Sequence, residues 1–110
     1  MSNELEVTGG EWFSKREGFS TVYVFSRIGG GLVQEVAACG PTNDGQDQQE
    51  ANAHLLAASK KLYEALIQAR ESLADSLATP GGWYAIGSNH ARDVIAEIDE
   101  ALAAARGEAQ

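Results

Sequence analysis

The sequence contains few side chains that could act as nucleophiles or metal ligands. Cys39 is the only cysteine, and His54 and His90 are the only histidines. A lone cysteine excludes an intramolecular disulfide and a cysteine-based zinc site. The histidines fall in separate helical segments, without the H-x-x-x-H or H-E-x-x-H spacing of a helical metal site. We therefore expect no metal and no cofactor, and we interpret Cys39 as a buried small hydrophobic residue.

The last helical segment carries a cluster of carboxylates. Asp93 and Glu97 are four residues apart and Glu100 follows one turn later, so the three share a face. Paired carboxylates act as acid and base only where burial separates their pKa values. On a polar helix face they form a solvated surface, or an acidic strip that binds an arginine-rich partner. We therefore predict no catalytic residues and no enzyme; an enzyme built on Cys39 or on carboxylates is the weaker alternative.

Aromatic residues are better candidates for a binding surface. Trp83 and Tyr84 follow a glycine-rich stretch, where their rings either fill the end of the core or anchor an interface. Arg92, one turn into the last helix, would reach a phosphate or carboxylate beside them. Asn52 either hydrogen-bonds locally or reads the edge of a ligand. The predicted ligand- or partner-binding residues are Trp12, Asn52, Trp83, Tyr84, Arg92, Asp93, Glu97 and Glu100.

The N-terminal part of the chain is predicted to form strands. Residues 11–15 are a short candidate strand, and residues 19–28 alternate between two sides. One side carries Val22, Val24 and Ser26, and the other carries Tyr23, Phe25 and Arg27. The glycines at 29–31 permit a tight hairpin, and residues 32–38 run back as the next strand. Because these glycines lead into a strand and not into a helix N-terminus, we reject a phosphate-binding loop.

Two helical segments follow, at residues 46–78 and 90–106. In the first, leucine and alanine recur at steps of three, four and seven, which places them on one helix face: Leu55, Leu62, Leu66, Ala69, Leu73 and Leu77. Pro80 and the glycines after it end this helix, and Gly107 ends the second. The predicted fold class is α+β in a single domain, residues 1–110. A three-stranded antiparallel β-meander within residues 1–39 is followed by a C-terminal antiparallel helical hairpin that packs on the sheet.

Charge and composition limit the classes of partner that we expect this protein to bind. The formal net charge is −8, from 16 acidic and 8 basic residues, which disfavours direct binding to nucleic acid or to an anionic membrane. An alanine-rich helical core buries little area, so we expect a homo-oligomer. The N-terminus lacks the pattern of a signal peptide, and no apolar run reaches the roughly 20 residues of a spanning helix. We therefore expect a cytoplasmic protein.

Two segments of the sequence resemble known proteins. Residues 50–66, EANAHLLAASKKLYEAL, resemble a segment of small proteins of tailed bacteriophages and prophages, in which Glu-Ala-Asn-Ala precedes an aliphatic and alanine-rich run. Residues 90–109, HARDVIAEIDEALAAARGEA, resemble the Ala-Arg-x-x-Ile-Ala close of the same proteins. The sequence departs from that pattern at Lys60 and Lys61, where the family usually has Ala-Pro.

This resemblance implies a phage or prophage accessory protein in the host cytoplasm. Such proteins often inhibit a bacterial defence system by stoichiometric binding, and anti-CRISPR-like docking on a defence protein through the acidic helix and the aromatic residues is our first hypothesis. One alternative is a sponge that binds a small cyclic nucleotide between subunits, a layout similar to the Thoeris anti-defence proteins. Its anion-binding residue would be Arg92 beside Trp83, or less favourably Arg27. The other alternative is a virion assembly or structural role.

Overall fold

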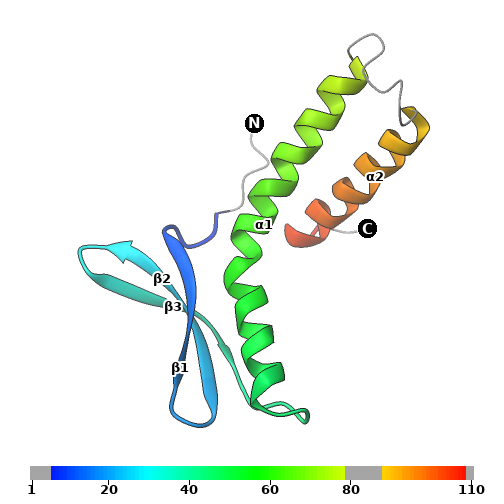
Figure 1. Ribbon diagram of the computed structural model, residues 1–110. Helices are drawn as coiled ribbons and strands as arrows, with labels where there is room; N and C mark the ends of the chain where they lie inside the picture. The colour runs from blue at the N-terminus through cyan, green and yellow to red at the C-terminus, as the bar shows by residue number, and fades with distance from the viewer. Residues whose placement is uncertain (1–5, 79–87, 109–110) are drawn as a thin grey trace. The chain divides into compact units, whose positions relative to one another are not determined.

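The computed structural model describes residues 6–78 and 88–108 (Figure 1). It contains three strands followed by two helices: β1 (Glu11–Glu17), β2 (Thr21–Gly29), β3 (Leu32–Cys39), α1 (Gln46–Ala78) and α2 (Ser88–Ala105). The strands form one antiparallel sheet in the order β1-β2-β3. The predicted α+β fold class, with a three-stranded meander before the helices, is confirmed.

The chain divides into two compact units within this layout. Met1–Lys60 contains the sheet and the first part of α1, and Lys61–Gln110 contains the rest of α1 and all of α2. The single domain expected from the sequence stays a prediction. Within the described residues, neither helix has an apolar stretch of the length that crossing a membrane requires.

The glycine run closes the hairpin between β2 and β3. Gly29 pairs with Leu32, so Gly30 and Gly31 form a two-residue turn. Their φ angles of 63° and 77° are those of a type I′ turn, which matches the right-handed twist of the flanking strands. Side chains larger than glycine rarely adopt two such angles in succession. The prediction of a hairpin in place of a phosphate-binding loop is confirmed.

The first unit has its core between the sheet and residues 46–60 of α1. Val22, Val24 and Ser26 are completely buried, so the predicted alternation of β2 is correct. The hydroxyl of Ser26 donates a hydrogen bond to the carbonyl of Gly9. On the helix, Gln49 and Ala53 are the buried residues. This sheet face therefore packs against one side of α1.

The predicted leucine stripe of α1 is wrong at its beginning. Leu55 is 63% exposed and Leu62 is 49% exposed, whereas Ala53 is completely buried. At 100° per residue, Leu55 lies almost opposite Ala53 on the helix. The inward side of this helix segment therefore begins with Gln49 and Ala53.

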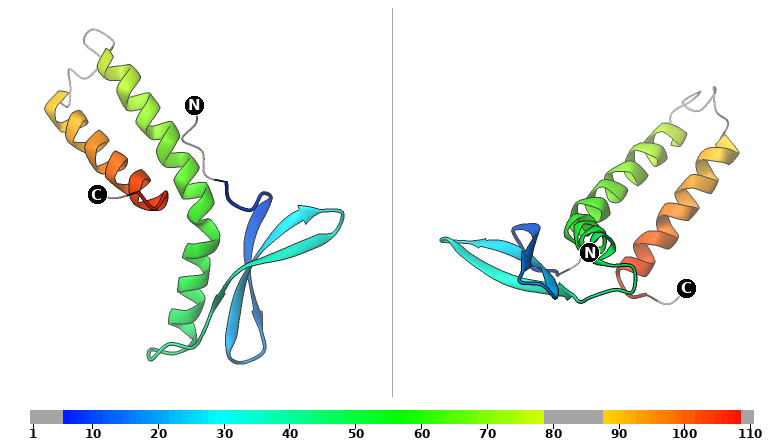
Figure 2. Two further views of the ribbon diagram at one scale, coloured as in Figure 1. Left: turned by 180° about the vertical axis from the view of Figure 1, so that it is seen from behind. Right: turned by 60° about the horizontal axis from the view of Figure 1, so that its bottom comes forward.

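The second unit is an antiparallel pair formed by residues 61–78 of α1 and by α2 (Figure 2). Arg106 Nε donates to the Tyr63 hydroxyl at 2.8 Å, and Arg70 Nε lies 2.5 Å from Asp99 Oδ1, so one helix ascends as the other descends. Ala91, Ile98 and Leu102 of α2 are buried, and their spacing of seven and four residues places them on one helix face. The predicted helical hairpin is therefore confirmed.

The ion pair between Arg70 and Asp99 lies on the surface, with side chains 41% and 48% exposed. The hydrogen bond and the charge of Asp99 raise the pKa of Arg70 above its ordinary value. Because exposed pairs contribute little, we expect Asp99→Asn to lower the free energy of unfolding by at most about 1 kcal/mol. Urea unfolding at low salt and at about 1 M salt, where the Debye length is roughly 3 Å, should show this difference shrinking. Asp93→Asn is the control, and a loss well above 1 kcal/mol that persists in salt would contradict the prediction.

Candidate functional site

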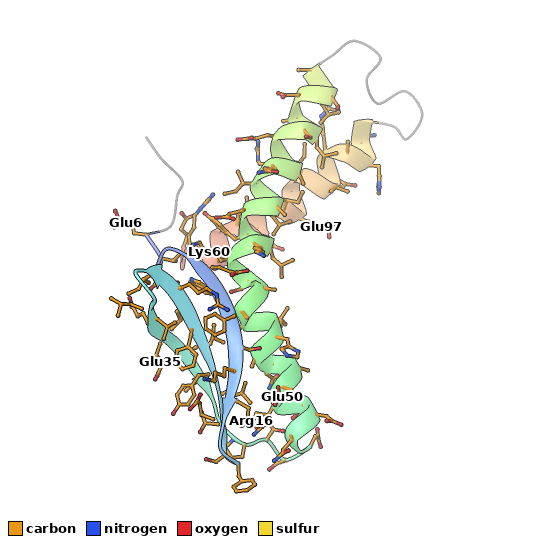
Figure 3. All side chains as sticks on the ribbon, turned by 60° about the vertical axis from the view of Figure 1, so that its left-hand side comes forward. Glu6, Arg16, Glu35, Glu50, Lys60 and Glu97 are labelled. Atoms are coloured by element: carbon orange, nitrogen blue, oxygen red, sulfur yellow. The ribbon has the colours of Figure 1, made fainter. Side chains whose placement is uncertain are left out.

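A buried glutamine joins α1 to the sheet. Gln49 is 1% exposed, and its Nε2 donates to the carbonyls of Ser20 and Cys39 at 2.9 and 2.8 Å. Its Oε1 accepts a hydrogen bond from Arg16 Nη2 at 2.7 Å. Arg16 Nε also donates to Glu50 Oε2 at 2.6 Å, and Figure 3 shows these two side chains between β1 and α1. One amide therefore fixes the β1–β2 turn and the end of β3 to the start of the helix.

A second polar connection lies farther along α1. Lys60 Nζ donates to the carbonyl of Gly10 at 3.0 Å and to that of Thr8 at 3.4 Å. The helix segment 46–60 is thus held along one face of the sheet at both of its ends. Two surfaces of this unit carry exposed or half-buried apolar side chains among the described residues: the opposite face of the sheet and the outward side of the helix segment.

The opposite face of the sheet carries an aromatic cluster, which we call the outer sheet face: Phe13, Tyr23, Phe25 and Arg27. Phe13 pairs with Phe25 across β1 and β2, and their ring centroids are 5.8 Å apart. The rings of Tyr23 and Phe25 stack at 5.5 Å. The guanidinium carbon of Arg27 lies 4.0 Å from the centroid of the Phe13 ring, within the range of a cation–π interaction.

The chemistry of the outer sheet face suits binding of a protein. Its three rings are only half-buried, and Arg27 is exposed. Both signs of charge surround the rings, because Arg27 pairs with Glu11 at 3.4 Å and Glu35 lies opposite Phe25 on β3 (Figure 3). Tyrosine, phenylalanine and arginine are enriched in protein interfaces, where an apolar centre is surrounded by a polar rim. Among the described residues, no group of histidine, cysteine and carboxylate side chains could hold a metal ion.

The outward side of the helix segment borders a groove. This α1 groove has a volume of about 360 Å³ and is lined by Cys39, Gly40, Asn52, Leu55 and Leu56. Leu55 and Leu56 are 63% and 43% exposed, so the groove is bordered by apolar surface that the first unit itself does not cover. Such a groove accepts an apolar side chain more readily than a charged ligand.

Comparison with known proteins identifies the lineage. The model of one family, described as Salmonella phage P22 protein Y8K6, matches residues 1–109. The chain belongs to this phage protein family. The phage origin predicted from the segments at 50–66 and 90–109 is therefore confirmed. No curated protein and no solved structure matches the chain.

Of the residues predicted from the sequence of this phage protein, the described ones lie on β1, α1 and α2. Trp83 and Tyr84 lie outside the described residues. Arg92, Asp93, Glu97 and Glu100 are exposed on α2. Asn52 is exposed and lines the α1 groove, whereas Trp12 is half-buried and its indole Nε1 donates to the carbonyl of Thr8 at 2.9 Å. The binding roles of these residues stay predictions.

Of the four residues of the outer sheet face, only Arg27 was a candidate binding residue from the sequence, and the face as a whole was not predicted as a site. The alternation of β2 placed Tyr23, Phe25 and Arg27 together, but aromatic residues in a strand are equally typical of a core. A signal was present: both sides of β2 are apolar, although a three-stranded sheet with two helices after it has enough helix to cover only one side well. The valine side is the one that is covered, and the aromatic side stays half-exposed.

Proposed function

We propose that this phage protein inhibits a bacterial defence system by stoichiometric binding, docking on a defence protein in the manner of an anti-CRISPR and without catalysis. The observation that carries this proposal is the outer sheet face, where Phe13, Tyr23 and Phe25 form a half-buried cluster beside Arg27. Membership of a phage protein family supports a target in the bacterial host. Stacked aromatic rings with an arginine above them are the residue types that dominate binding hot spots.

The same surface indicates the chemistry of the target. An apolar patch on the defence protein would cover the rings, and an acidic group in it would pair with Arg27, whose present partner Glu11 is 58% exposed at its side chain and held at only 3.4 Å. Breaking a long, exposed ion pair costs little free energy, so Arg27 can leave Glu11 and pair with an acidic group of the target. The net charge of −8 further favours a target with basic surface around the contact.

Reversal of one charge tests this proposal. Bacterial strains that each carry one defence system are made to express the protein, and restored plaque formation by a sensitive phage identifies the target. We expect Arg27→Glu to weaken the complex with that purified target by about tenfold or more, since hot-spot losses exceed roughly 2 kcal/mol. Lys61→Glu is the control, because Lys61 is also an exposed basic residue and is not among the predicted binding residues, and we expect this variant's affinity to stay within about twofold.

Other results of these experiments would favour a different site or a different function. If Arg92→Glu abolishes binding while Arg27→Glu does not, the site lies on α2, where the sequence places it, and the outer sheet face is not the interface. If no defence system is blocked, thermal shifts with cyclic and linear nucleotides test the sponge, since a tight ligand raises the stability by RT ln(1 + [L]/Kd). Detection of the chain in purified virions would instead favour the structural role.

A further inference from the structure

Two exposed apolar features lie at the end of the first unit where α1 begins. Phe19, in the turn between β1 and β2, is 92% exposed, the largest fraction among the exposed large hydrophobic residues of the described chain. The α1 groove, bordered by Leu55 and Leu56, is the second feature. Gln49 links them, because its Nε2 donates both to Ser20, next to Phe19, and to Cys39 in the groove wall.

We propose that a second copy of this chain covers this end, with Phe19 of each copy inserted in the α1 groove of the other. An aromatic ring that projects from a short turn is an anchor, and a leucine-lined groove is the kind of pocket in which such anchors bind. The turn is fixed in place, because Arg16 Nη1 donates to the carbonyl of Phe19 at 3.3 Å. Because the backbone of this turn is already ordered, insertion of the ring costs little backbone conformational entropy.

The position of the two features allows a closed two-fold dimer. A two-fold interface uses the same patch on both copies, so the projecting residue and its pocket must be neighbours on one surface. The shared hydrogen bonds of Gln49 provide this proximity. Each Phe19 would bury most of the roughly 150–250 Å² of an aromatic side chain. A specific interface buries at least about 1,000 Å² in total, so a polar rim must surround the two rings and the four leucines.

The charge of the chain gives this dimer a distinctive salt dependence. Each copy carries a net charge of −8, so two copies repel each other at low salt. Because Phe19, Leu55 and Leu56 make an apolar contact, screening of this repulsion should tighten the dimer as salt is added. Docking on a basic target weakens under the same conditions. Self-association and the proposed inhibition are therefore distinguishable by measurement, and each can fail without the other.

The first experiment is sedimentation equilibrium of the full chain over a range of protein and salt concentrations. We expect the wild type to reach twice the mass of one chain, and Phe19→Ala to raise the dimer Kd by about tenfold or more. Leu32→Ala is the matched control: Leu32 is 64% exposed at the other hairpin end, and its replacement should leave the Kd within about twofold. A wild-type chain that stays monomeric at every concentration overturns the proposal.

The second experiment locates the contact. With p-benzoylphenylalanine at position 19, irradiation should join two chains, and the crosslinked peptide of the partner should contain residues 39–40 or 52–56. Leu55→Glu, which places a charge in the groove, should weaken the dimer as much as Phe19→Ala does. Crosslinks confined to other residues, or a dimer that keeps the wild-type Kd in both variants, overturn the proposal. Circular dichroism of each variant confirms that it is folded.

Discussion

Gln49→Leu should lower the free energy of unfolding by about 3 kcal/mol. Leucine has a similar size, but it cannot donate to the carbonyls of Ser20 and Cys39 or accept from Arg16. A buried polar group that loses its partner costs roughly 1–3 kcal/mol. Urea unfolding followed by circular dichroism measures the change.

The neighbouring glutamine is the control for this prediction. Gln48 is exposed, and its Nε2 donates to Asp44 at 3.0 Å. Gln48→Leu should therefore change the free energy of unfolding by no more than about 0.5 kcal/mol. Equal stability of the two variants would show that the buried amide does not hold α1 to the sheet.

A double-mutant cycle refines the test. Arg16→Met removes the guanidinium that donates to Gln49 Oε1. The loss of unfolding free energy caused by Arg16→Met should therefore be smaller in the Gln49→Leu variant than in the wild type. Residues of one hydrogen-bond network show coupling energies of roughly 0.5–3 kcal/mol. Additive effects of the two substitutions would contradict a shared network.

Gly10→Ala should destabilise the protein by about 2–4 kcal/mol. The φ angle of Gly10 is 83°, in a region that costs other residues roughly 1–3 kcal/mol. A Cβ at this position would also overlap the carbonyl oxygen of Arg27 and lie 2.9 Å from Ser26 Oγ. Since a backbone atom cannot move aside as a flexible side chain can, β1 would have to shift against β2.

Gly9 supplies the matched control. A Cβ at Gly9 would meet no atom within 4 Å, so Gly9→Ala should change the stability by no more than about 0.5 kcal/mol. Thermal and urea unfolding of the two variants measure the difference. If Gly10→Ala is as stable as Gly9→Ala, the close approach of the N-terminal segment to β2 is not a constraint on the fold.

The secondary structure followed directly from local patterns in the sequence. The alternation of residues 19–28 identified β2 and its buried side, because successive strand residues point to opposite faces. The glycines at 29–31 identified a hairpin, because few other residues adopt positive φ in succession. Gly107 identified the end of α2. The Gly107 N–H donates to the carbonyl of Ala104, and the Glu108 N–H donates to the carbonyl of Ala103. This pair of hydrogen bonds is common at the C-terminal ends of helices.

The inward side of α1 was decided only by tertiary structure. Its sequence offers both a leucine stripe and an alternative side that begins with Gln49 and Ala53, and periodicity cannot rank them. In the folded protein the alanine side is the covered one, since Ala53 is completely buried and Leu55 is 63% exposed. Burial of Gln49 is unexpected, because glutamine is usually exposed. The free-energy cost of burying its amide is offset by hydrogen bonds to the carbonyls of Ser20 and Cys39, which only the folded sheet places beside it.

Exposure of the candidate binding surfaces was also decided by the tertiary structure. The sequence determined that Tyr23, Phe25 and Arg27 share one side of a strand, and the phage lineage was also visible in it. Only the tertiary structure decided that α1 covers the valine side and leaves the aromatic side half-exposed. The physical reason is that residue type reports how apolar a side chain is, whereas exposure depends on which neighbours come to cover it.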